Sequence, residues 1–176
     1  MATPKLVLPA EAHRALWSHL LGNADGDEEA AFVFADSSVE TGGVRLRYSE
    51  HRLVPPCGFA ERSAYYLELT DEERAGAIRR AHDSDKVLIE LHSHPFQGRA
   101  GFSPSDVAGL REFVPHVRWR LRKKPYAALV VARSSFDALT WVGEGPDPVS
   151  LSCDVNGKEL RPTGESRRSW RLGGFA

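Results

Sequence analysis

The stretch that decides the fold is Val87-Leu88-Ile89-Glu90-Leu91-His92-Ser93-His94-Pro95, followed by Ser103-Pro104-Ser105-Asp106. An apolar run of this kind predicts a buried strand. Side chains two residues apart in a strand share a face, about 6.6 Å apart along the backbone, so His92 and His94 can converge on one metal ion. Pro95 has no N–H for a ladder and ends the strand. We therefore expect both histidines at the carboxyl end of a strand.

The second segment predicts the start of a helix. Ser103 is a favourable N-cap, Pro104 suits the first helical position, and Asp106 falls in the first turn. On this pattern alone, Ser103 and Asp106 need be no more than helix caps. The loop at 95–102 is short and contains glycine, however, so it can return Asp106 to the two histidines. Two histidines and one carboxylate are three protein ligands, which leave a fourth position for water, as in catalytic zinc sites.

A metal-activated water needs a base, and an acidic pair precedes another apolar run. Glu28 and Glu29 stand at the start of a predicted strand at 30–35, and the residues themselves do not decide between them. Glu90 shares the strand face of His92 and His94 and is a further candidate ligand or base. The alternative for Glu90 is a hydrogen bond to a neighbouring group.

These elements together match a known pattern. His92-x-His94-Pro95, Ser103-x-x-Asp106 and the upstream Glu-x-x-small strand resemble the JAB/MPN domain with its JAMM metalloprotease signature. The resemblance implies that His92, His94 and Asp106 bind zinc and that Ser103 supports a tetrahedral intermediate. It also favours Glu28 as the base, because Glu28 lies three residues before a small residue, Ala31. The implied fold is an MPN/cytidine-deaminase-like mixed β-sheet flanked by helices.

The similarity covers roughly residues 5–145, with two departures from the family pattern. Ala31 stands where glycine is usual, and the loop between His94 and Ser103 is about one residue longer than the commonest spacing. We expect a JAB/MPN (JAMM) metalloprotease domain at 1–145 and a partly irregular C-terminal extension at 146–176.

The function that the resemblance implies is that of a zinc-dependent isopeptidase or peptidase. Such enzymes cleave after the C-terminal glycine of a ubiquitin-like protein, in deconjugation or in precursor processing. The small size resembles compact bacterial members, which accompany E1- and E2-like enzymes, some of them in antiphage defence. One alternative is an inactive MPN scaffold, although such scaffolds characteristically lose ligands that are intact here. The other is a different metal-dependent hydrolase, which would usually need a longer chain and more His or Asp ligands.

Length and charge narrow the remaining possibilities. A chain of 176 residues is expected to form one domain with a real core. The formal net charge of −1 gives no reason to expect nucleic acid or a membrane surface as a partner. No apolar stretch approaches the roughly 20 residues of a membrane span, so we expect a cytoplasmic protein. Cys57 and Cys153 are expected as free thiols in a reducing compartment, although one disulfide is compatible with the count.

Periodicity and turn residues predict an α/β (α+β sandwich) fold. The expected helices are 9–21, 70–82 and 103–117, and the expected strands are 30–35, 44–54, 65–69, 86–94, 126–133, 138–142 and 158–160. The segment 118–124 is basic and contains Trp119. It suits a solvated loop better than a surface for an acidic partner or nucleic acid. The ending Leu172-Gly173-Gly174 is similar to a ubiquitin-like tail, and we expect it to be a plain flexible end.

Overall fold

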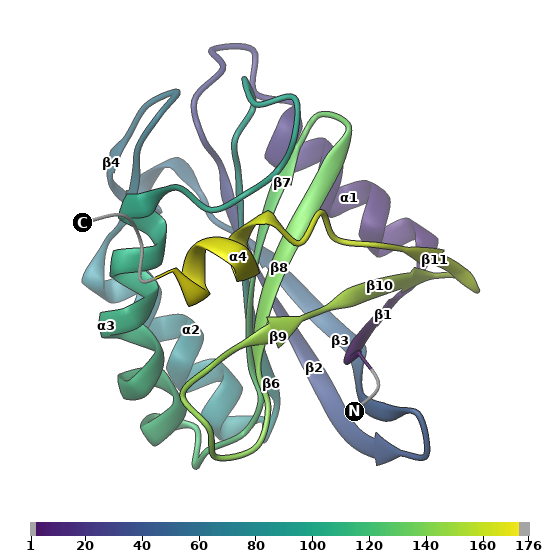
Figure 1. The fold of residues 1–176 in the computed structure, drawn as a ribbon. Coiled ribbons are helices and arrows are strands. Elements are labelled where there is room, and N and C mark those ends of the chain that lie inside the picture. Colours follow the sequence, from purple (N-terminus) through teal and green to yellow (C-terminus); the bar gives the residue numbers. More distant parts are fainter. Residues whose placement is uncertain (1–2, 173–176) are drawn as a thin grey trace.

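The computed structural model describes residues 3–172 and contains a twisted nine-stranded mixed sheet with helices on both faces (Figure 1). The predicted α/β class is confirmed. The strand order is β11-β10-β1-β3-β2-β6-β7-β8-β9. The strands of this sheet are β1 (Lys5–Leu8), β2 (Ala30–Glu40), β3 (Gly43–Leu53), β6 (Val87–Ser93), β7 (Tyr126–Ala132), β8 (Ser135–Trp141), β9 (Val149–Ser150), β10 (Ser152–Val155) and β11 (Lys158–Leu160). The helices are α1 (Ala10–Leu21), α2 (Asp71–Asp83), α3 (Pro104–Arg120) and α4 (Glu165–Arg171), with a short 3₁₀ turn at Pro56–Gly58.

The sheet separates two hydrophobic cores, because both of its faces are covered. Leu16 and Leu20 of α1 pack on one face, against the odd-numbered side chains of β2 and β6 such as Val33 and Ile89. Helices α2 and α3 cover the other face, against even-numbered side chains such as Phe32. Alternation along each strand therefore decides on which side of the sheet a residue lies. The same alternation decides to which face of the sheet the polar residues near the strand ends point.

Helix α3 is the crossover between two parallel neighbours, β6 and β7. Parallel strands need such a connection, and it begins beyond the carboxyl end of β6. The first turn of α3 is thereby brought to the same edge of the sheet as the end of β6. The predicted return of Asp106 towards the two histidines follows from this topology.

A separate hairpin lies beside that edge. It consists of β4 (Phe59–Arg62) and β5 (Leu67–Leu69), which pair with each other in antiparallel orientation. The sequence predicted one strand at 65–69, of which β5 forms the second part, whereas β4 was not predicted. The amide N–H of Glu28 donates to the carbonyl of Ser63 at 2.8 Å, which ties the hairpin to the start of β2.

Four strands and one helix were not predicted: β1, β4, β9, β10 and α4. Residues from 146 on, which we expected to form a partly irregular extension, contribute three strands to the main sheet. The predicted strand at 158–160 is confirmed as β11, paired with β10. The glycines of the Leu172-Gly173-Gly174 ending lie outside the described residues.

Two further predictions concern the environment of the chain. In the described part of the chain, no helix has the length and apolar character needed to cross a membrane. Cys57 is exposed, Cys153 is buried, and both are free thiols. Burial raises the pKa of the Cys153 thiol to about 12.

Candidate metal centre

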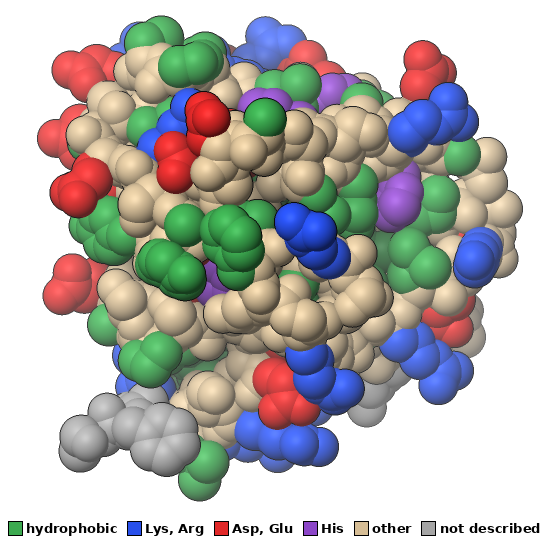
Figure 2. All heavy atoms as spheres, turned by 90° about the horizontal axis from the view of Figure 1, so that it is seen from above, with side chains coloured by type: hydrophobic (Ala, Val, Ile, Leu, Met, Phe, Trp, Pro, Cys, Tyr) green, Lys and Arg blue, Asp and Glu red, His purple; other side chains and the backbone are tan. Residues whose placement is uncertain are grey.

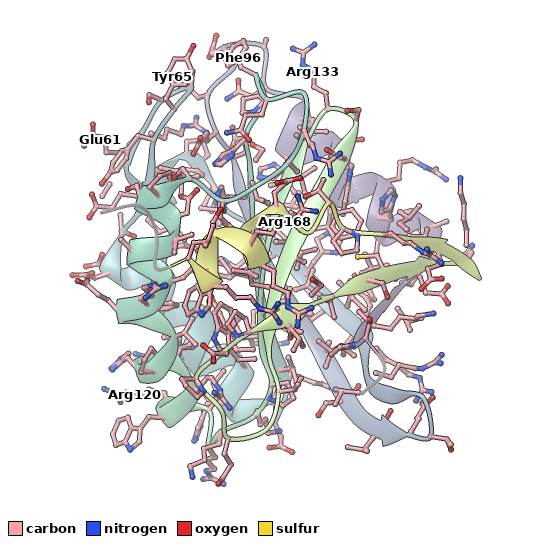
Figure 3. All side chains as sticks on the ribbon, viewed as in Figure 1. Glu61, Tyr65, Phe96, Arg120, Arg133 and Arg168 are labelled. Carbon is pink, nitrogen blue, oxygen red and sulfur yellow. The ribbon has the colours of Figure 1, made fainter. Side chains whose placement is uncertain are left out.

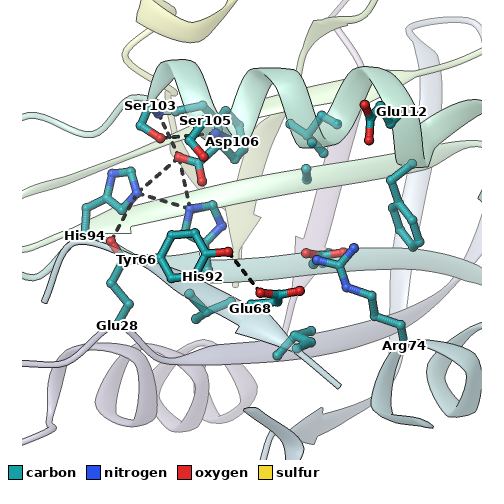
Figure 4. A pocket seen from close by; sticks show the side chains of 18 of the residues that line it. Glu28, Tyr66, Glu68, Arg74, His92, His94, Ser103, Ser105, Asp106 and Glu112 are labelled. Atoms are coloured by element: carbon teal, nitrogen blue, oxygen red, sulfur yellow. Dashed lines mark hydrogen bonds and ion pairs between the residues drawn. The ribbon is translucent and has the colours of Figure 1, made fainter. Parts of the chain in front are cut away.

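The two histidines lie where the sequence predicted them, at the carboxyl end of β6. His92 is the next-to-last residue of the strand and pairs with Val130 of β7, and His94 follows immediately. The amide N–H of His94 donates to the carbonyl of Val131 at 2.8 Å, which continues the ladder. Both side chains are buried on the α3 side of the sheet, with their Nε2 atoms 3.2 Å apart (Figure 4).

Asp106 reaches the histidines from the first turn of α3, where it also caps the helix. The Ser103 hydroxyl accepts from the Asp106 amide at 3.1 Å, and Asp106 Oδ2 accepts from the Ser103 amide at 2.7 Å. This reciprocal arrangement is a capping box. The same Oδ2 atom lies 3.3 Å from His94 Nε2 and 3.6 Å from His92 Nε2. Asp106 therefore caps the helix and approaches the histidines at the same time, because the capping hydrogen bonds hold its carboxylate in this position.

The three donor atoms form a triangle with sides of 3.2, 3.3 and 3.6 Å. In a tetrahedral zinc site with bonds of about 2.0–2.1 Å, neighbouring ligand atoms are about 3.3–3.4 Å apart. The observed triangle fits this spacing. His92, His94 and Asp106 are thus a group that could hold a metal ion.

The polar atoms of the triangle also favour a cation among them. Two imidazole nitrogens face each other and one carboxylate oxygen, so a proton or a metal ion is needed to offset the repulsion of their lone pairs. In the protein alone, burial lowers the pKa of His92, but hydrogen bonding and charge from Asp106 outweigh it and the pKa is raised. Burial raises the pKa of Asp106, yet both histidines and the Ser103 contact bring it far below its ordinary value. The carboxylate is therefore ionised, as a metal ligand must be.

Glu28 approaches this group from the neighbouring strand. β2 and β6 are antiparallel, with Ala30 opposite His92 and the Ser93 amide bonded to the Glu29 carbonyl at 3.0 Å. Continuing this register places Glu28 opposite His94, and its Oε1 lies 3.6 Å from His94 Nε2. Burial raises the pKa of Glu28, the two histidines oppose this shift, and Asp106 adds to it. Glu28 consequently holds a proton more readily than an exposed glutamate does.

Glu29 points to the opposite face of the sheet, because it is the next residue along β2. Its carboxylate accepts from Asn23 at 2.9 Å and forms an ion pair with Arg62, and it lies 3.8 Å from His19 of α1. Sequence reasoning left the choice between Glu28 and Glu29 to the family resemblance. The strand register supplies an independent physical reason for placing Glu28 at the centre.

Glu90 shares the face of His92, but it is engaged elsewhere. Its Oε2 accepts a hydrogen bond from the buried Tyr126 hydroxyl at 3.1 Å. Burial raises the pKa of Tyr126 well above its ordinary value, and the Glu90 charge adds to the shift. Glu90 thus makes the expected hydrogen bond with a neighbouring group, as the acceptor.

A cleft of about 390 Å³ opens beside the triangle (Figure 4). One wall is α3, and the other is β5 with the turn before it. Three lining residues that the sequence did not single out are Tyr66, Glu68 and Arg74. Tyr66 donates its hydroxyl hydrogen to Glu68 at 3.0 Å. No short-range pattern marks them, because the hairpin and α2 bring them to the cleft from outside the β6–α3 unit.

An exposed aromatic rim lies at the same end of the molecule. Tyr65 is 84 % exposed and Phe96 is 58 % exposed, and their ring centroids are 6.1 Å apart. Gly26 has a φ of 75°, and a Cβ added there would stand 2.7 Å from the Phe96 ring. The glycine thus both provides the left-handed turn and lets the ring pack. Seen from above, hydrophobic side chains gather on this end with a histidine between them (Figure 2).

Comparison with models of known protein families and with curated proteins found no match for this chain.

Proposed function

We propose that this protein is a zinc-dependent isopeptidase or peptidase of the JAB/MPN type, acting after the C-terminal glycine of a ubiquitin-like protein. The observation that carries the proposal is the donor triangle with Glu28 beside it. Three ligands and a buried, separate carboxylate are the parts that a hydrolytic zinc site needs. The resemblance in the sequence supplies the substrate class, and E1- and E2-like enzymes are the expected makers of the conjugates.

The roles of the residues follow from their positions. His92, His94 and Asp106 hold the ion, which when bound supplies Lewis acidity and lowers the pKa of water to about 7. Glu28 Oε1 accepts a proton from the attacking water and later delivers it to the leaving amine. The Ser103 oxygen accepts from the Asp106 amide, so its own O–H remains able to donate to the developing oxyanion. A C–O bond forms, the C–N bond breaks, and the products are a carboxylate and an amine.

The cleft suits an extended chain. β5 belongs to a two-stranded sheet and lines the cleft, whereas β4 does not. One edge of β5 is thus available for backbone hydrogen bonds to a substrate tail. We propose that the tail lies between β5 and α3, with room only for glycine next to the bond that is cut.

The aromatic rim supports a protein substrate. Exposed, adjacent aromatic side chains beside a cleft are typical of a surface that contacts another protein. Phe96 is held against Gly26 rather than free in solvent, which reduces the entropy lost on contact.

The experiment is a cleavage assay on ubiquitin-like proteins that end in Gly-Gly, fused to a second protein or joined to a lysine. We expect zinc-dependent cleavage after the last glycine. Replacing that glycine by leucine is expected to slow the reaction by about two orders of magnitude or more. Equal rates on both substrates would contradict the proposed channel. Hydrolysis of phosphoesters alone would indicate the other class of hydrolase, and zinc binding without any hydrolysis would indicate a scaffold.

A further inference from the structure

A second groove runs along a different face of α3, between its carboxyl-terminal half, α4 and the loop at 143–149. Its volume is about 1200 Å³, compared with about 390 Å³ for the cleft beside the donor triangle. Small-molecule pockets usually measure about 300–1,000 Å³. The size of this groove therefore favours a segment of a macromolecule.

The floor of the groove is apolar and rigid. Trp141 is buried and donates through its indole N–H to the Pro146 carbonyl at 2.9 Å. Trp170 of α4 packs edge-on against Trp141, with ring centroids 5.4 Å apart. The Arg111 guanidinium covers the Trp170 ring at 4.6 Å. The rings of Trp141 and Trp170 are thus packed against other groups, whereas Trp119 of α3, which also lines the groove, is 71 % exposed and offers an apolar surface to a partner.

The rim of the groove is strongly basic. Six of its lining residues are cationic, namely Arg111, Arg118, Arg122, Lys123, Arg167 and Arg171. The two lining acids, Glu144 and Asp147, already have partners. Glu144 pairs with Lys123 at 2.9 Å, and Asp147 accepts from the Trp170 indole at 3.3 Å. Since the whole chain has a net charge of −1, this positive charge is concentrated locally. Figure 3 shows two further arginines on the same elements, Arg120 on α3 and Arg168 on α4.

Two guanidinium groups in the groove have hydrogen-bonding capacity left over. The Nε atoms of Arg118 and Arg167 are buried without a hydrogen-bond partner among the described residues. The other nitrogens of Arg118 donate to the carbonyls of Gly143 and Gly145, which carry no charge. Because these Nε atoms are buried, the cationic groups that a docked carboxylate can reach are the exposed side chains of Arg122, Lys123 and Arg171.

We propose that this groove binds an acidic, partly apolar segment of a partner protein. The apolar floor accepts its aliphatic or aromatic side chains, and the basic rim accepts its carboxylates. The groove is distinct from the cleft beside the metal centre, because the two share only one lining residue, Leu110. The groove includes part of the basic segment 118–124, which was expected to be a solvated loop, but residues 118–120 form the end of α3.

The test starts from a library of random peptides about 12 residues long, panned on the whole protein. The comparison variant carries Arg122→Glu and Arg171→Glu, whose side chains make no hydrogen bond or ion pair within residues 3–172. We expect the enriched peptides to combine acidic with aromatic or aliphatic residues. In fluorescence anisotropy, the best peptide should bind the variant at least about tenfold more weakly than the wild type, which is about 1.4 kcal/mol.

A matched control has the same charge change elsewhere. Arg14 on α1 and Arg79 on α2 are exposed, and the Arg14→Glu, Arg79→Glu protein should bind the peptide as the wild type does. Equal weakening in the control, enrichment of peptides without acidic residues, or no enrichment at all would overturn the proposal. Tighter binding of oligo(dT) than of any peptide, lost in the Arg122/Arg171 variant, would assign the groove to nucleic acid instead. Thermal unfolding and zinc content verify that both variants are folded.

Discussion

The two ends of helix α3 differ in charge and in the kind of polar group that they present. At its amino-terminal end, Asp106 is bonded to the helix cap and faces two histidines. At its carboxyl-terminal end, Arg118 donates only to backbone carbonyls and keeps a buried Nε without a partner. The signs of charge agree with the helix dipole, which favours anions at the first end and cations at the second.

This difference separates two kinds of site. The atoms at the amino-terminal end are held in position by the protein itself, which suits chemistry that needs a fixed geometry. At the carboxyl-terminal end, the exposed side chains of Arg122 and Arg171 make no hydrogen bond or ion pair within residues 3–172, which suits an incoming partner. Four predictions test this contrast, in order of decreasing expected effect.

Removing a ligand is expected to have the largest effect. His92→Ala or Asp106→Ala should reduce bound zinc from about one equivalent to a small fraction, because two remaining ligands hold the ion poorly. Elemental analysis after gel filtration measures this. Full occupancy in either protein would refute the ligand assignment. Binding of acidic peptides to the groove should be unchanged.

Changing the proposed base should separate metal binding from turnover. Glu28→Gln is expected to retain zinc and to lower kcat by about 10²–10⁴-fold, because the amide cannot accept the proton. Glu29→Gln is the matched control, since Glu29 lies on the α1 side with Arg62 and Asn23. The Glu29→Gln substitution is expected to lower the stability of the protein more than it lowers kcat. Metal analysis and initial rates on both proteins decide the matter, and a reversed pattern would mean that the strand register is shifted.

Removing the helix cap is expected to have a moderate effect. Ser103→Ala loses the acceptor for the Asp106 amide and should cost about 1 kcal/mol of stability, as N-caps usually do. Thr70→Ala removes the equivalent cap of α2, where Thr70 accepts from Glu73 at 3.2 Å. Urea unfolding should show similar losses in the two proteins. Only Ser103→Ala should also impair cleavage, and equal activity of both would remove Ser103 from the mechanism.

The smallest effect is expected at the other end of α3. Lys123→Ala removes an ion pair with Glu144 whose side chains are 69 % and 84 % exposed. Such exposed pairs contribute little, so the melting temperature should not change measurably. Peptide binding to the groove should nevertheless weaken, and it should weaken further as salt is added. A clear drop in melting temperature would show that the rim is structural.

The part of the site that the sequence revealed is the part governed by local rules. The period of two along a strand placed His92 and His94 together, and the N-cap pattern placed Asp106 in the first turn. Because α3 begins just beyond β6, a short loop was sufficient to join them. A physical reason for choosing Glu28 over Glu29 needed the pairing of β2 with β6, which joins residues far apart in the sequence.

The elements that were missed lack such local signals. β1 has only four residues between two prolines, and its strand character comes from its neighbours β3 and β10. β10 contains Asp154 and ends at a turn, so it has little apolar alternation. Helix α4 starts after Gly164, which offers no side-chain cap, and it is held by Asp137, which accepts from the Ser166 amide at 2.7 Å. Only the folded sheet brings Asp137 to that position.

The position of β1 between β3 and β10 also affects the order in which the strands of the sheet can pair during folding. On the ribosome Lys5 is made well before its partner Ser152, because β2, β3, β6, β7 and β8 all lie between them in the sequence. The edge of β1 that pairs with β10 therefore stays unpaired until β10 has been made. Closing a loop as long as the one between β1 and β10 is slow. Glu28, the histidines and Asp106 are joined by β2, β6 and α3, which are all made before β10. The end with the candidate metal centre is thus expected to assemble first, and pulsed hydrogen exchange during refolding should protect the amides of β6 before those of β1.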